Sequence, residues 1–231
     1  MIVSINQPAY LPWPGYFSRI QASDLHIVLD HVQFEKNSYT NRNRIRTAQG
    51  WTWLTVPLKT KGRFGQLAIN EVEIDAERGW PAKHWGTLRQ NYGKAPHFAA
   101  HARFFEDLYA RPWQRLAGLL DAATGYLLDA FGIRTPLARS SGMAVEGRKS
   151  ELVLNLCRSA GAKVYLSGPL GRDYLDEAAF RQAGIEVRYH DYAPPTYAQA
   201  HPGFEPALSA VDLLFNHGPD SARILATGAQ P

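Results

Sequence analysis

The chain has 231 residues, of which 45% are apolar and 20% are charged. This length and the many aromatic residues favour a folded chain with one compact core over a disordered chain. A single cysteine, Cys157, excludes an internal disulfide framework and a cysteine-rich zinc site. The formal net charge of +4 is small for a dedicated nucleic-acid-binding protein. It is equally compatible with a small anionic ligand or with no ligand at all.

The apolar segments are short. None approaches the roughly 20 residues that a membrane-spanning helix needs. The first ten residues carry no basic flank and no small-residue cleavage site, so we expect no secretory signal. A soluble, cytoplasmic protein is the expectation.

The N-terminal part alternates short apolar runs with a helical stretch. Met1–Asn6 and Leu25–Leu29 are predicted strands, and Tyr16–Ala22 is a predicted helix between them. Three prolines exclude a helix in Gln7–Gly15. The spacing predicts a βαβ unit with parallel strands.

The middle of the chain has a different pattern. Trp51–Leu58 and Leu67–Ile74 alternate apolar and polar residues in places, which predicts an antiparallel hairpin closed by the basic turn Lys59–Gly65. The stretch Trp80–Phe131 is predicted to form three helices. The two breaks between these helices are expected near Pro96 and Pro112.

The last third returns to alternating strands and helices, with glycines at the expected helix C-caps, Gly161 and Gly184. We expect a loose tail from Thr227. The predicted strands are Thr135–Arg139, Val164–Leu166 and Ile185–Tyr189, and the predicted helices are Lys149–Ala160, Arg172–Gln182 and Leu208–Phe215. The predicted fold class is α/β: one domain over 1–231, with a mainly parallel sheet and an inserted hairpin and helical subregion over 47–131.

Three loops leave the carboxyl ends of predicted parallel strands, where such sheets bind ligands. The first, Gln7–Tyr16, combines rigid prolines with aromatic side chains. These rings are either held ready for a ligand or packed on the core as a rigid corner. The third, Ser167–Tyr174, contains Gly168 and Gly171, which allow close approach of a ligand to the backbone. Asp173 is a candidate helix cap there.

The second loop, Ser140–Ser150, nearly matches a phosphate-binding P-loop. Arg148 is one residue too many before the lysine, so we reject that motif. The start of a helix beside Arg148 and Lys149 still favours an anion. The alternative is an ordinary solvated turn.

The segment Asp30–Arg46 is polar and basic. Its arginines suit a bidentate grip on phosphate or carboxylate, and with Tyr39 they also suggest single-stranded nucleic acid. The alternative is a solvated surface loop. Elsewhere, His84 is either a general acid or base or a surface histidine. The pair His97 and His101 is expected on a solvated helix face rather than at a metal.

These motifs together resemble the WbqC-like family over nearly the whole chain. The matching residues, in chain order, are QPxYLPWxGY at Gln7–Tyr16, Asp30 and Gln33, NRNRI at Asn41–Ile45, LTVP at Leu54–Pro57, Lys83 and His84, NYxK at Asn91–Lys94, Ser140 and Ser141, GxK at Gly147–Lys149, YLSG at Tyr165–Gly168, Gly171, Tyr174, YxQ at Tyr197–Gln199, Phe204, Ser209, Asp212 and Gly218. A weaker resemblance links the first strand and loop to nucleotidylyltransferases, although both histidines of their HxGH motif are absent here.

The resemblance implies a role in O-antigen or related polysaccharide biosynthesis. Transfer of a glycyl or other aminoacyl group to a sugar has been suggested for the type member of the family. The first hypothesis is therefore a transferase or amide-forming ligase that acts on an amino-sugar nucleotide or a similar anionic molecule. The alternatives are a nucleotidyltransferase that uses ATP or CTP and a non-catalytic protein that binds nucleotide sugars or docks on a partner.

The cofactors that this chemistry needs depend on the donor. ATP and Mg²⁺ are implied only if the enzyme activates its own donor, and not if a thioester or a charged tRNA is the donor. No metal ligands are assigned, and the oligomeric state is open.

The candidate catalytic residues are Asp30, His84, Arg42 and Lys149. The candidate substrate-binding residues are Gln7, Tyr10, Trp13, Gly15, Tyr16, Gln33, Arg44, Ser140, Ser141, Gly147, Ser167, Gly168, Gly171, Tyr174, Tyr197 and Gln199.

Overall fold

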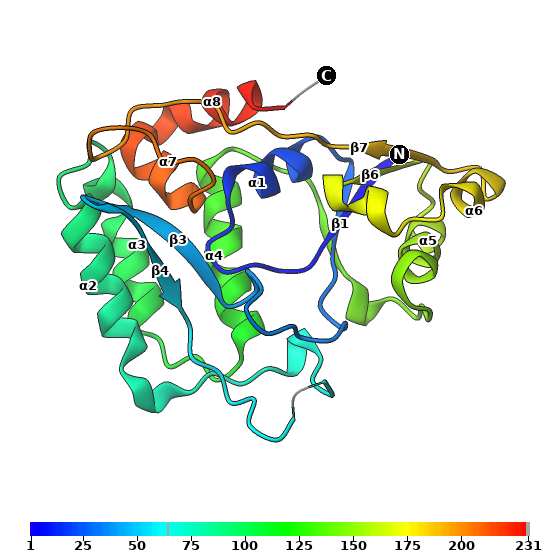
Figure 1. The fold of residues 1–231 in the computed structure, drawn as a ribbon, viewed down its shortest axis with the longest axis horizontal. Helices are drawn as coiled ribbons and strands as arrows, with labels where there is room; N and C mark the ends of the chain where they lie inside the picture. The colour runs from blue at the N-terminus through cyan, green and yellow to red at the C-terminus, as the bar shows by residue number, and fades with distance from the viewer. Residues whose placement is uncertain (64, 230–231) are drawn as a thin grey trace.

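A parallel sheet forms one half of the molecule in the computed structural model, which describes residues 1–63 and 65–229 (Figure 1). Its spatial order is β5–β2–β1–β6–β7, and each neighbouring pair in this order is parallel. The strands are β1 (Ile2–Asn6), β2 (Leu25–Val28), β5 (Leu137–Arg139), β6 (Val164–Ser167) and β7 (Glu186–Tyr189). The predicted α/β class and the parallel βαβ start are confirmed.

Helices cover both faces of this sheet. On one face, α5 (Lys149–Ser159) and α6 (Glu177–Gln182) pack on the apolar side chains of β1 and β2. The other core contains α1 (Pro14–Gln21), whose buried Phe17 packs edge to face on Phe131 at the end of α4. Pro14 occupies the first turn of α1, where its missing N–H costs nothing, so the helix begins two residues earlier than predicted.

The segment between β2 and β5 forms the other half of the molecule. The predicted three helices are present, and their breaks fall where the prolines require them. They are α2 (Trp80–Tyr92), α3 (Phe98–Ala110) and α4 (Leu116–Ala130). From the C-terminal part, α7 (Ala210–His217) packs on this bundle through Phe215, and α8 (Ser221–Thr227) packs on α1.

The predicted hairpin is wrong in position. The strands that pair are β3 (Arg42–Thr47) and β4 (Gly50–Thr55), so part of the expected surface loop Asp30–Arg46 is a strand. Leu67–Ile74 contains a single 3₁₀ turn and only one bridge, Leu58 to Ile74, to the expected partner. The arginines of β3 alternate with inward-facing residues, as in a strand with one solvent-facing side. Three arginines within five residues suggest a polar loop when the partner strand is unknown.

Two C-terminal predictions also need correction. The helix expected from Arg172 begins only at Glu177, because Asp176, not Asp173, accepts the capping hydrogen bond from the Ala179 N–H. The tail from Thr227 is held as far as Ala229, which bridges to Tyr192. Residues 230 and 231 lie outside the described part of the chain. No helix in the described residues is long and apolar enough to cross a membrane.

Candidate functional site

A cavity lies where the sheet reverses its strand order. The chain continues from β1 to β2 on one side and from β6 to β7 on the other, so a crevice forms between the carboxyl ends of β1 and β6. The cavity there has a volume of about 600 Å³, within the range that holds small ligands. Seven predicted substrate-binding residues line it, namely Gln7, Trp13, Tyr16, Ser167, Gly168, Gly171 and Tyr174.

The loop after β1 is held from inside the core. The Tyr10 hydroxyl lies 2.6 Å from that of Tyr109 and 2.9 Å from His84 Nδ1, and Tyr10 is fully buried. Tyr10 therefore anchors the loop and does not line the cavity. Gly15 also contributes to the cavity without lining it. The indole of Trp13 lies so close to Gly15 that any side chain at position 15 would overlap the ring. Rigid anchoring holds Trp13 at the cavity wall.

The loop after β6 approaches α1 closely. A side-chain carbon at Gly168 would overlap the guanidinium of Arg19, and one at Gly171 would overlap the Ser167 hydroxyl. Glycine at these two positions lets the loop pass directly over the arginine. Arg19 itself lies on α1, lines the cavity, and is only 9% exposed. It is absent from the candidate residues that the sequence indicated.

Arg19 has no partner for its charge in the part of the chain that the structure describes. Its guanidinium makes no hydrogen bond and no ion pair with any described residue, and its Nε is buried without a partner. Burial lowers the pKa of Arg19, while the neighbouring tyrosines 165, 16 and 174 act in the opposite direction. No aspartate or glutamate lines the cavity within the described part of the chain. A buried, unpaired guanidinium is costly, and an anionic ligand would compensate it.

Two histidines near Arg19 stay neutral. Burial, and then the charge of Arg19, lower the pKa of His26 to about 3, and the same two causes lower the pKa of His190. His26 Nδ1 is 2.8 Å from the Ser4 hydroxyl, and His190 Nε2 is 3.0 Å from the Ser18 hydroxyl. The surroundings of Arg19 therefore add no second positive charge, and the cavity presents one cation among aromatic and hydroxyl groups.

The model of the WbqC-like protein family matches residues 7–224, which include every residue of the cavity except those of β1. The chain belongs to the WbqC-like protein family. It is also 42% identical over 224 residues to "Uncharacterized protein Rv1507c" of Mycobacterium tuberculosis, with 95% of each chain covered. No solved structure matches, so the resemblance to nucleotidylyltransferases is not confirmed.

In this WbqC-like chain, Asp30 joins the ends of two strands. Its Oδ1 accepts hydrogen bonds from the Ser140 hydroxyl (3.0 Å) and the Ser141 N–H (2.9 Å), and its Oδ2 accepts one from the Ser141 hydroxyl (2.7 Å). Burial alone would raise the pKa of Asp30, but these hydrogen bonds outweigh it and the pKa is lowered. These hydrogen bonds join the end of β2 to the end of β5, and the catalytic role of Asp30 stays a prediction.

His84 lies in the helical half of the WbqC-like fold. It is 3% exposed, and its ring packs against Trp80, Tyr109 and Tyr10. Burial lowers its pKa to about 4. The side chain is thus a neutral core group in contact with the anchor Tyr10.

The remaining predicted catalytic residues also lie outside the cavity lining. Arg42 is on β3, where its guanidinium covers the Trp53 ring and donates to the Asn37 carbonyl. Lys149 begins α5 with a positive φ and is exposed, although Val153 one turn later does line the cavity. Nine of the predicted binding residues also lie outside the cavity lining: Tyr10, Gly15, Gln33, Arg44, Ser140, Ser141, Gly147, Tyr197 and Gln199.

Gln199 and Tyr197 form a separate buried network. The Asp212 carboxylate, fully buried, accepts hydrogen bonds from the Tyr92 and Tyr197 hydroxyls and from Gln199 Nε2, each at 2.9 Å. These contacts tie the segment before α7 to the helical bundle. Within the described residues, no group of three or more His, Cys, Asp or Glu side chains is placed to hold a metal ion.

Proposed function

We propose that this protein is a group-transfer enzyme that binds an anionic small molecule, of the sugar-nucleotide class, in the cavity between β1 and β6. The single observation that carries the proposal is the buried and unpaired guanidinium of Arg19 at the point where the sheet reverses its strand order. A phosphate or carboxylate against Arg19 would compensate that charge. The rings of Trp13, Tyr16 and Tyr174 would pack on the sugar or base.

The reaction that best suits this site is transfer of an acyl or aminoacyl group to the amine of a bound amino-sugar nucleotide. The amine attacks the activated carbonyl and the C–N bond forms. The bond from the carbonyl to the activating group then breaks, and the amine proton leaves with that group. Family membership and the implied role in polysaccharide assembly support this chemistry.

A thermal-shift screen tests the binding step. The panel holds UDP- and GDP-sugars, CTP, coenzyme A and ATP, each with and without Mg²⁺. A ligand at about 100 times its Kd stabilises the fold by about 2.7 kcal/mol, which raises the Tm by several degrees. We expect a sugar nucleotide to raise the Tm of the wild type and not that of Arg19→Met. Equal shifts in both proteins, or no shift across the panel, would count against the proposal.

One observation favours a second candidate, a binding protein without catalysis. Asp30, His84, Arg42 and Lys149 all lie outside the cavity lining, and no other paired acid and base lines it among the described residues. Mass spectrometry of the bound sugar nucleotide after incubation with thioester or aminoacyl-tRNA donors separates the two. A mass increase of the acceptor supports transfer, and tight binding with unchanged mass supports the second candidate.

A further inference from the structure

One face of the β3–β4 hairpin carries arginines and tryptophans side by side. In the observed register Arg44 is opposite Trp53 and Arg46 is opposite Trp51, and residues two apart share a face. The Arg42 guanidinium lies 4.3 Å from the ring centre of Trp53, and that of Arg44 lies 5.1 Å from the ring centre of Trp51. The guanidinium groups and rings therefore form a continuous layer.

This layer is open to solvent and reaches the cavity. Tyr39 is 48% exposed and Trp51 is 43% exposed, and each lies less than 6 Å from the ring of Trp53. Tyr39 also lines the cavity, as does Ala207, whose carbonyl accepts a hydrogen bond from Arg44. Exposed aromatic rings beside guanidinium groups form the kind of surface on which nucleic-acid bases stack.

The charges of Arg42 and Arg44 on this face are not paired with any described carboxylate, and both side chains donate hydrogen bonds to backbone carbonyls. Arg46 is buried and interacts electrostatically with Asp212. Arginines elsewhere on the surface do pair, for example Arg172 with Asp191. Glu205 is near the turn of the hairpin at Gly50 and marks one end of the basic layer.

We propose that this face, formed by Tyr39, Arg42, Arg44, Trp51 and Trp53, binds single-stranded RNA. Phosphates would meet the guanidinium groups, and bases would stack on the exposed rings and on the guanidinium planes. Stackable rings favour this ligand over an acidic polymer without bases. An RNA strand held here would end at the cavity and would carry the activated donor to it. This carrier role rests on the proposed function, whereas the binding of RNA does not.

Fluorescence anisotropy with a labelled single-stranded RNA of about 10 nucleotides tests the inference. We expect Arg42→Ala to weaken binding about tenfold and to reduce its salt dependence, because a phosphate contact is lost. Trp51→Ala should weaken binding by a similar factor with unchanged salt dependence, because a stacking contact is lost. Circular dichroism and melting of each variant show whether the hairpin remains folded, and Trp51→Phe should restore most of the affinity.

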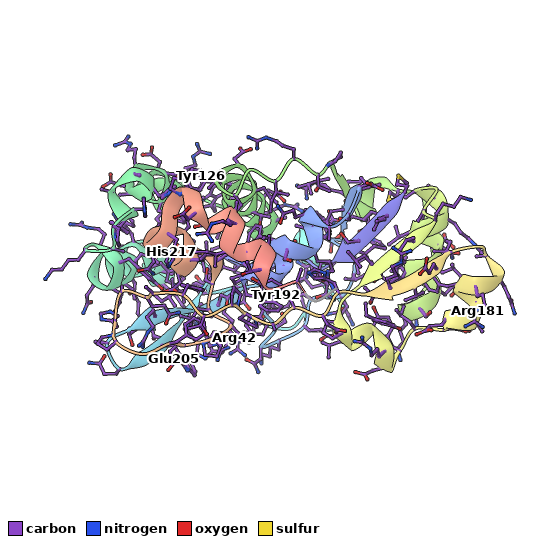
Figure 2. All side chains as sticks on the ribbon, turned by 90° about the horizontal axis from the view of Figure 1, so that it is seen from above. Arg42, Tyr126, Arg181, Tyr192, Glu205 and His217 are labelled. Carbon is purple, nitrogen blue, oxygen red and sulfur yellow. The ribbon has the colours of Figure 1, made fainter. Side chains whose placement is uncertain are left out.

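The matched control is Arg181→Ala, which removes the same charge from α6 at one end of the molecule, whereas Arg42 lies near the middle (Figure 2). It should bind RNA like the wild type. Equal weakening by Arg181→Ala, or equal affinity for an abasic strand of the same length, would overturn the inference in favour of unspecific attraction to polyanions. The RNA titration and the sugar-nucleotide screen use different ligands and different readouts, so failure of the one is distinguishable from failure of the other.

Discussion

Arg19 lies directly against the backbone of Gly168, with no room between them for a side-chain carbon. The helix that follows β1 and the loop that follows β6 therefore meet at one charged group. A cation at this place, without a partner among residues 1–63 and 65–229, is the most specific feature of the cavity.

Gly168→Ala should displace the Arg19 guanidinium and abolish ligand-induced stabilisation. Because the added methyl group overlaps only the end of the Arg19 side chain, which borders the cavity and can shift, we expect a loss of no more than about 1 kcal/mol in the free energy of unfolding. Urea unfolding and thermal shift with a sugar nucleotide measure the two effects. The control is Gly125→Ala in α4, where a methyl group meets open space and should stabilise the helix by about 0.5 to 1 kcal/mol. Retained ligand stabilisation in Gly168→Ala would show that the close approach is not needed for binding.

His84 should make the fold sensitive to acid. Burial lowers its folded pKa to about 4, below the usual value of 6.5, so the unfolded chain binds its proton first as pH falls. The stability is complete above pH 6.5 and declines by about 3 kcal/mol as pH falls towards 4. His84→Gln removes this titration and should flatten the stability curve between these values. Parallel curves for the two proteins, measured by urea unfolding at several pH values, would contradict this reading.

Asp30 should contribute stability at neutral pH that is lost in strong acid. Its folded pKa is lowered by the hydrogen bonds from Ser140 and Ser141, so the contribution is present above its unfolded pKa and is lost as pH falls through the folded pKa. We expect Asp30→Asn to cost about 1.5 to 3 kcal/mol at pH 7 and less near pH 3. Asp129→Asn, at an exposed ion pair with Arg134, should cost less than about 1 kcal/mol. A cost that does not change with pH would show that the carboxylate charge is not what joins the strands.

The sequence predicts the fold correctly where the apolar residues are regularly spaced and prolines separate the helices. The βαβ start and the three helices followed from apolar spacing and from breaks at Pro96 and Pro112. The hairpin was misplaced because the turn between Thr47 and Gly50 carries no strong turn dipeptide, while arginines on the outer face of β3 resembled a loop.

The cavity was foreseen only in part. Sheet topology brings together the loops after β1 and β6, as the rule for the carboxyl ends of parallel strands predicts. Arg19 was missed because it stands inside a predicted helix, where a single arginine is ordinarily solvated. No sequence signal marks it, because the burial of this helix along nearly all its length is seen only in the structure.

Arg19→Met gives the most direct separation of function from structure. Replacing an unpaired buried charge by an apolar side chain of similar length removes a desolvation cost, so we expect the free energy of unfolding to stay constant or to rise by about 1 kcal/mol. The same change should abolish stabilisation by an anionic ligand. Arg19→Lys keeps a charge without the planar fork and should retain only part of the ligand stabilisation. Urea unfolding without ligand and thermal shift with ligand provide the two measurements. If Arg19→Met instead lowers stability by more than about 1 kcal/mol and keeps the ligand response, the guanidinium is a structural element of α1 and the anion must bind elsewhere.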